Sequence, residues 1–170
     1  TIATTHFMEQ RDLTYIIEAH TERARKSENR FRNWDQRTPY YVHPIWCAAM
    51  IRQETSLAEK DRIAGSQALL YHDIQEDTTA DLPEWLPNEV KLLIDNLTFN
   101  SSEDEWKNLW KKEKLVRLLK LYDKVSNMMD CVWMKPERRQ QHQSHLRKLC
   151  EDVERNYGEL NITKLARIFF

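Results

Sequence analysis

Glycine is nearly absent from this chain: its 170 residues contain only two, Gly65 and Gly158. A dinucleotide-binding fingerprint needs three clustered glycines, and a P-loop needs two at a fixed spacing. Neither motif can be built from this sequence, so any phosphate chemistry must rely on side chains and a metal ion. The low glycine content and the presence of only five prolines also disfavour a turn-rich all-β fold.

The length suits one domain, which we expect to span residues 1–170. Hydrophobic residues make up 41% of the chain, enough for a substantial core. The 26 Lys and Arg residues against 27 Asp and Glu leave a net charge of -1. This near balance disfavours a nucleic-acid polymer as partner, because nucleic-acid binders carry a basic surplus.

Three dispersed cysteines without a CxxC pair predict reduced thiols rather than disulfides or a thiolate zinc site. No apolar run is long enough to span a membrane, and no signal-type segment follows Thr1. We therefore expect a cytoplasmic protein without a membrane partner. The sequence leaves a homo-oligomer open.

Helical spacing of apolar residues dominates and predicts an all-α fold. Ser56 to Glu59 and Ser102 to Glu105 have capping-box spacing, Pro136 suits a helix start, and Gly158 suits a helix end. The expected helices are about 7–26, 44–54, 56–72, 88–97, 102–133 with one break near residue 112, 136–157 and 163–169. Residues 27–38 and 78–87 are expected to be loops.

Four side chains form a possible metal-binding set: His43, the adjacent pair His72 and Asp73, and Asp123. Two imidazoles and two carboxylates suit a borderline-to-hard divalent ion such as Mn, Fe, Zn or Mg. Such an ion lowers the pKa of bound water and polarises a phosphoryl oxygen. Asp123 is the more informative carboxylate, because it lies in an otherwise apolar stretch where an unpaired charge would be costly.

Polar residues one helical turn beyond these ligands could supply the remaining chemistry. If the helix continues past residue 72, the pairs His72–Glu76 and Asp73–Asp77 stack on one surface. Glu76 and Asp77 would then lie where a general base or a water-orienting carboxylate is needed. Asn127 follows Asp123 by four residues and suits a substrate hydroxyl.

Three local motifs carry a family resemblance: Thr-Pro-Tyr-x-x-His-Pro at 38–44, His-Asp-x-x-Glu-Asp-Thr at 72–78 and Asp-Lys-x-x-Asn at 123–127. With the order His…His-Asp…Asp, they resemble HD-domain metal-dependent phosphohydrolases. The resemblance is closest to the hydrolase domain of Rel/SpoT proteins and to the small stand-alone alarmone hydrolases. It covers about residues 17–129.

The resemblance implies an HD-domain helical bundle of about six to nine helices and hydrolysis of the alarmone (p)ppGpp to release pyrophosphate. It implies a single Mn²⁺ ion as cofactor and a small-molecule nucleotide as substrate. It also implies site residues: His43, His72, Asp73 and Asp123 as metal ligands, Glu76 and Asp77 as catalytic carboxylates, and Asn127 on the substrate ribose.

The sequence departs from that family in two places. An Arg-Lys pair that contacts guanine usually precedes the Pro-Tyr-x-x-His-Pro motif, whereas this chain has Arg32-Asn33 at the matching spacing and Arg25-Lys26 farther upstream. The interval between Asp73 and Asp123 is also somewhat short for the family. An altered substrate pocket is the expected consequence.

Basic residues cluster twice. Six cations between Arg23 and Arg37 form either a phosphate-facing rim or a solvated helix end, and Arg32 is favoured as a substrate contact. The run from Lys107 to Lys120 is read as the charged outer face of an amphipathic helix, although Lys120 or Lys124 could reach a phosphate.

Three further histidines receive structural interpretations. His142 and His145 are expected to be exposed polar residues, and His20 is expected at the edge of the core.

The first functional hypothesis is therefore a (p)ppGpp 3′-pyrophosphohydrolase. The alternatives are an HD-type (deoxy)nucleotide phosphohydrolase, either a nucleotidase or a dNTP triphosphohydrolase, and a non-catalytic helical interaction module.

Overall fold

The computed structural model describes residues 8–170, and within them it contains helices and loops without a strand. The all-α prediction is confirmed. Residue 7, where the first helix was expected to start, lies outside the described residues. The α-helices are α1 (Gln10–Glu22), α2 (Val42–Arg52), α3 (Glu59–Tyr71), α4 (Ile74–Asp77), α5 (Asn88–Leu97), α6 (Ser102–Asn108), α7 (Lys114–Met129), α8 (Pro136–Tyr157) and α9 (Asn161–Ala166).

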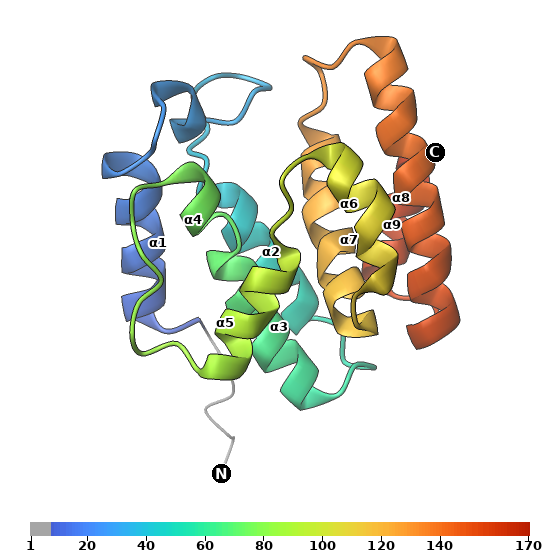
Figure 1. The fold of residues 1–170 in the computed structure, drawn as a ribbon, viewed down its shortest axis with the longest axis horizontal. Coiled ribbons are helices and arrows are strands. Elements are labelled where there is room, and N and C mark those ends of the chain that lie inside the picture. Colours follow the sequence, from blue (N-terminus) through green and yellow to red (C-terminus); the bar gives the residue numbers. More distant parts are fainter. Residues whose placement is uncertain (1–7) are drawn as a thin grey trace.

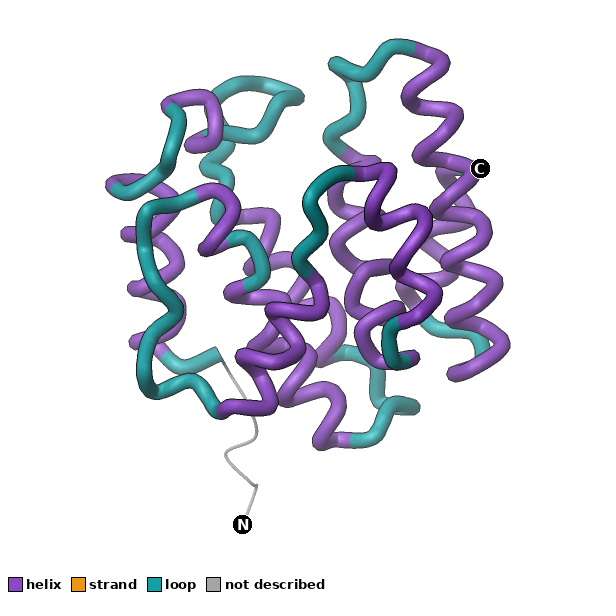
Figure 2. The backbone as a smooth tube through the Cα atoms, viewed as in Figure 1, coloured by secondary structure: helices purple, strands orange, loops and turns teal. Residues whose placement is uncertain are grey.

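Helices α2, α3 and α7 form the middle of the bundle. Figure 1 shows α1 at one side and α8 at the other, with α2 and α3 between them. Helix α2 packs against both α3 and α7, and α8 packs against α7. The core between these helices is fully buried; its largest members include Tyr71, Tyr122, Ile51, Leu69, Leu118, Leu119 and Leu121. Residues 78–87 run as a loop down one side of the molecule (Figure 2).

Several predicted helix boundaries agree with the structure. Helix α5 occupies the predicted span, α8 starts at Pro136, and Gly158 ends α8 with a φ of 79°. The predicted break near Lys112 separates α6 and a 3₁₀ turn from α7.

Two predicted N-caps are wrong. Helix α3 starts at Glu59 without a side-chain cap, so Ser56 does not open it. At α6 the capping oxygen belongs to Ser101, which accepts a hydrogen bond from the Asp104 backbone N–H, and not to Ser102. Helix α7 also ends earlier than predicted, at Met129. Neighbouring serines offer the same chemistry, and tertiary packing decides which one takes the extended backbone conformation that a cap requires.

Gly65 is the position where the lack of a side chain matters for packing. A Cβ on Gly65 in α3 would lie 2.8 Å from both Ile51 Cδ1 in α2 and Leu119 Cδ2 in α7. Both neighbours are fully buried, so their side chains have little room to move. The glycine therefore allows α3 to approach the two helices that carry His43 and Asp123.

Replacing Gly65 by Ala is expected to destabilise the protein by about 1–3 kcal/mol, because overpacking outweighs the better helix propensity of alanine. Urea unfolding followed by circular dichroism measures this change. A matched Ala64→Gly variant, one residue earlier in α3, removes a methyl group instead and should lose about 1 kcal/mol through helix propensity. A Gly65→Ala variant more stable than the wild type would contradict the packing argument.

Candidate metal centre and active site

The four predicted ligands converge from two helices and one helix junction. His43 lies in the first turn of α2, Asp123 lies in α7, and His72 and Asp73 form the junction between α3 and α4. The two histidine Nε2 atoms are 3.3 Å apart. Asp73 Oδ2 lies 3.3 and 3.2 Å from them, and Asp123 Oδ1 lies 3.3 and 3.4 Å from them.

These separations match donors that share one metal ion, since ligands at about 2.1 Å from an ion lie roughly 3 Å from their neighbours. The donor atoms of His43, His72 and Asp123 all lie within 4.8 Å of one another, and Asp73 contacts the same two histidine nitrogens. All four residues are buried. The cluster therefore fits a divalent cation.

Hydrogen bonds behind the histidines fix which nitrogen faces the cluster. His72 Nδ1 lies 2.6 Å from the Leu69 carbonyl oxygen, to which it must donate its proton. His43 Nδ1 lies 2.7 Å from Ser126 Oγ. In both rings Nε2 is left facing the cluster, which is the outer-shell arrangement typical of metal-binding histidines.

The electrostatics of the cluster also favour a cation. Burial alone would lower the pKa of His72, but the negative charges of Asp73 and Asp123 outweigh it and raise that pKa. Burial opposes ionisation of Asp123, yet Lys120, Lys124 and the two histidines hold its pKa well below the usual range. The site thus keeps its carboxylates ionised and attracts positive charge.

Glu76 and Asp77 lie beside the cluster on α4. The helix does not continue past residue 72: α3 ends at Tyr71, and α4 is a separate single turn. The Asp77 N–H still donates to the Asp73 carbonyl at 2.9 Å, so this i,i+4 pair is kept. Desolvation and the charge of Asp73 raise the pKa of Glu76 to about 7 and that of Asp77 to about 6.

The residues that follow α1 support α4 by donating hydrogen bonds to the backbone carbonyl groups of α4. The Arg25 N–H donates to the Asp77 carbonyl at 2.8 Å, and the Arg25 guanidinium donates to the Gln75 carbonyl at 3.1 Å. Arg23 similarly binds the Thr79 carbonyl. For these two arginines the structure thus shows contacts with backbone rather than a free rim, and Arg25 lies next to the predicted catalytic turn.

Arg32 is buried, and its guanidinium is engaged. It donates to the Ser126 carbonyl at 3.0 Å and lies 3.5 Å from the Asp130 carboxylate. Asp130 also accepts the backbone N–H groups of Asn33 and Trp34 at 2.8 and 2.7 Å. This carboxylate ties the loop before α2 to the end of α7.

The amphipathic interpretation placed Lys120 on an outer face, and this is wrong: Lys120 is buried. Its Nζ lies 2.9 Å from Asp123 Oδ2 and 3.4 Å from Glu105 Oε1. Lys124 Nζ lies 2.8 Å from the same Glu105 oxygen. Asn127 donates to Asp123 Oδ1 at 2.8 Å. The three predicted substrate contacts on α7 therefore surround the predicted ligand Asp123.

Glu105 was missed by the sequence reasoning, which assigned it only to a helix start. It is buried, and its second carboxylate oxygen lies 2.9 Å from His145 Nε2. Burial opposes its ionisation, but Lys124, His145 and Lys120 hold the pKa of Glu105 at about 2. The only sequence signal was a glutamate one helical turn after a capping serine.

The histidine interpretations need correction. His145 is buried, and His142 is half-buried with its ring 5.3 Å from the Trp106 ring; burial lowers the pKa of His142 to about 4. His20 is fully buried, and within residues 8–170 neither ring nitrogen has a hydrogen-bond partner. Its ring lies 5.1 Å from Tyr40, close to the metal cluster rather than at the core edge. Burial lowers the pKa of His20 to about 4.

Two adjoining cavities open beside the cluster. One of about 310 Å³ is lined by Asp73, Glu76, Asp77, Lys120 and Asp123 among others. A second of about 320 Å³ is lined by Arg32, Asn33, Trp133, Arg138 and His142 among others. Tyr40, Ser102, Lys124 and Asn127 line both, so the two cavities form a continuous cleft.

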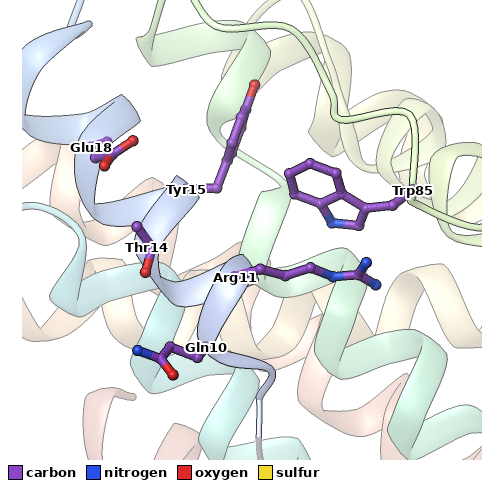
Figure 3. A pocket seen from close by; sticks show the side chains of 6 residues that line it. All are labelled: Gln10, Arg11, Thr14, Tyr15, Glu18 and Trp85. Carbon is purple, nitrogen blue, oxygen red and sulfur yellow. The ribbon is translucent and has the colours of Figure 1, made fainter.

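A third hollow lies on α1, where Arg11 stacks over the Trp85 ring at 5.2 Å (Figure 3). It is open, and none of the predicted site residues lines it.

Within residues 8–170, no helix combines the length and apolar character needed to cross a bilayer. The described cysteines are free thiols.

Comparison with solved structures supports the fold. The chain superposes with a TM-score of 0.71 and 20% identity on a metazoan orthologue of SpoT described as hydrolysing ppGpp and acting in starvation responses, with 97% of both chains covered. This likeness confirms the HD-type helical fold.

Comparison with known sequences identifies the family. No family model matches the chain. It is 28% identical over 136 residues to the guanosine-3′,5′-bis(diphosphate) 3′-pyrophosphohydrolase MESH1 of Xenopus tropicalis, covering 74% of each chain. It is 30% identical over 137 residues to the protein of that name from Homo sapiens, covering 75% of each chain. The chain therefore belongs to the MESH1 family of guanosine-3′,5′-bis(diphosphate) 3′-pyrophosphohydrolases.

Proposed function

We propose that residues 1–170 form one HD-type domain that hydrolyses (p)ppGpp at the 3′ position and releases pyrophosphate. The observation that carries this proposal is the convergence of His43, His72, Asp73 and Asp123 at one end of a cleft that Glu76 and Asp77 also line. Family membership supplies the substrate class.

The four converging residues would hold one divalent ion, for which we propose Mn²⁺. Two imidazole nitrogens and two carboxylate oxygens suit Mn²⁺, and the cleft beside them leaves room for substrate. Such an ion activates water and polarises a phosphoryl oxygen.

Glu76 and Asp77 are proposed as the catalytic carboxylates. Their raised pKa values place them close to neutrality, where a carboxylate is effective in accepting and returning a proton. Arg25 donates hydrogen bonds to the Gln75 and Asp77 carbonyl groups of α4, and these bonds hold the backbone that carries both side chains.

The remaining cleft residues are proposed to bind the nucleotide. Lys120 and Lys124 keep positive charge next to Asp123, where a phosphate would lie, and Asn127 is placed for a ribose hydroxyl. Arg32 lines the second cavity, and Asp130 holds its guanidinium in place. The planar guanidinium would therefore give the nucleotide base a fixed flat surface to pack against.

Incubation of the protein with Mn²⁺ and ppGpp tests the activity, with GDP and pyrophosphate as the expected products. A panel of (d)NTPs and nucleoside monophosphates runs in parallel. Release of orthophosphate or tripolyphosphate from that panel, without hydrolysis of ppGpp, would favour the nucleotidase or triphosphohydrolase alternative. Absence of all products with Mn²⁺ bound would reject the enzyme proposal.

Trp133 is expected to provide the stacking surface for the base. It lines the second cavity with 61% of its surface exposed. Replacing Trp133 by Ala should raise KM for ppGpp about tenfold and leave kcat nearly unchanged, because stacking on one aromatic ring contributes roughly 1–3 kcal/mol. Steady-state kinetics measure this change.

Val132→Ala is the matched control, since Val132 is similarly exposed but does not line the cavity. Equal KM values for the two variants would remove Trp133 from the base site.

A further inference from the structure

Tyr40 occupies the junction of the two cavities. Its hydroxyl donates a hydrogen bond of 2.6 Å to Asp73 Oδ2. Its ring lies 5.6 Å from the His43 ring, and the Arg32 guanidinium lies 5.7 Å from its centroid. The ring is therefore packed from two sides, which restricts the position of the hydroxyl.

Three of the four predicted ligands are oriented by groups other than Tyr40. His43 contacts Ser126, His72 contacts the Leu69 carbonyl, and Asp123 receives both Lys120 and Asn127. Each of these supporting contacts comes from a neighbouring or the same helix.

Asp73 lacks that kind of support. It lies between α3 and α4 and belongs to neither helix. Within residues 8–170 its carboxylate contacts the two ligand histidines and Tyr40. The Tyr40 hydroxyl is thus the hydrogen-bond donor that holds Asp73 from outside the ligand set.

The geometry at Asp73 Oδ2 is compatible with a metal ligand. This oxygen receives the Tyr40 hydroxyl and also faces His43 Nε2 and His72 Nε2. A carboxylate oxygen has two lone pairs, so one can accept from Tyr40 while the other points toward a shared cation.

We propose that Tyr40 is a positioning residue for the metal centre: its hydroxyl orients the Asp73 carboxylate toward the two histidines, and the affinity of the site for a divalent ion depends on this hydrogen bond. The inference rests on the metal site of the proposed function. It does not require the substrate to be ppGpp.

Tyr40→Phe tests the inference, because it removes only the hydroxyl. Metal-free wild type and variant are titrated with Mn²⁺ and, separately, with Zn²⁺ by calorimetry. Tyr40→Phe is expected to raise the Kd about 10- to 100-fold, the usual effect of losing an outer-shell partner. The melting temperatures of the two metal-free proteins report whether the fold is unchanged.

Tyr41→Phe is the matched control on the adjacent residue. Tyr41 is half-buried against the core, and its hydroxyl makes no hydrogen bond with the part of the chain that the structure describes. The Kd of the Tyr41→Phe variant for each ion should equal that of the wild type. At saturating Mn²⁺, Tyr40→Phe should still bind one equivalent of the ion, so that its deficit is a weaker affinity and not a lost site.

A Tyr40→Phe variant with wild-type Kd for both ions overturns the inference, as does an equal loss in Tyr41→Phe or a wild type that binds neither ion. The proposed function fails separately: a wild type that binds Mn²⁺ but releases no pyrophosphate from ppGpp rejects the activity, while a weakened Kd in Tyr40→Phe still supports the positioning role.

Discussion

Replacing Asp123 by Asn is expected to lower hydrolysis by more than roughly 10³-fold, the largest effect among the substitutions considered. Asp123 is buried in α7, with Oδ1 facing both histidines and Oδ2 paired with Lys120. Asparagine preserves the volume but removes the charge that draws a cation. The variant should therefore lose metal binding in calorimetric titration as well as pyrophosphate release.

Asp152→Asn is the control for losing a partly buried ion pair. Asp152 in α8 pairs with Arg117 at 2.6 Å and lines neither cleft cavity. It should keep its activity within about twofold, with some loss of stability. An Asp123→Asn variant that retains a tenth of the wild-type rate with an intact helical spectrum would reject Asp123 as a metal ligand. The interaction-module alternative would gain support if the wild type itself neither bound metal nor hydrolysed nucleotide.

Replacing Glu76 by Gln is expected to reduce kcat by roughly 10²–10⁴-fold while metal affinity stays near that of the wild type. Glu76 lines the cleft but makes no contact with the histidine nitrogens within the described residues, so removing its charge should affect proton transfer more than metal binding. Kinetics and calorimetry on the same preparation separate the two effects.

Glu89→Gln, an exposed substitution in the first turn of α5, controls for the loss of one acidic side chain.

A general base works when ionised, so the rate should fall as the pH drops through the pKa of Glu76. Desolvation and the charge of Asp73 raise that pKa to about 7. A bound cation lowers it, so the acidic limb should lie at or below about pH 7. If kcat is unchanged in Glu76→Gln, Glu76 is not the general base, and Asp77 becomes the candidate for that role.

Much of the bundle could be predicted from local signals. Helices α5 and α8 follow from apolar spacing bounded by Pro136 and Gly158, whose conformational restrictions act within one or two residues. The cap of α6 is Ser101 and not the predicted Ser102, because adjacent serines have the same local chemistry. The predicted cap at Ser56 is wrong because α3 starts at Glu59 without a side-chain cap. Whether the helix continues beyond residue 72 was left open by the sequence, since no proline or glycine marks the break after Tyr71.

For the site, the sequence could predict the residue types but not their supports. His43, His72, Asp73 and Asp123 stood out because imidazoles and carboxylates in this order carry recognisable chemistry, and the structure brings them together. The burial of His145 against Glu105 could not be predicted, because the two residues lie on different helices and neither has an unusual neighbourhood in the sequence.

The near absence of glycine determined from the sequence alone that phosphate would have to be handled by side chains, because backbone cradles require residues without a Cβ. Helical periodicity determined the fold class, since it depends only on the spacing of apolar residues. Only the tertiary structure decided that Gly65 lets α3 approach α2 and α7, that Lys120 in α7 also reaches Glu105 in α6, and that Tyr40 holds Asp73. Those contacts depend on distances between helices, which are set when the whole core packs.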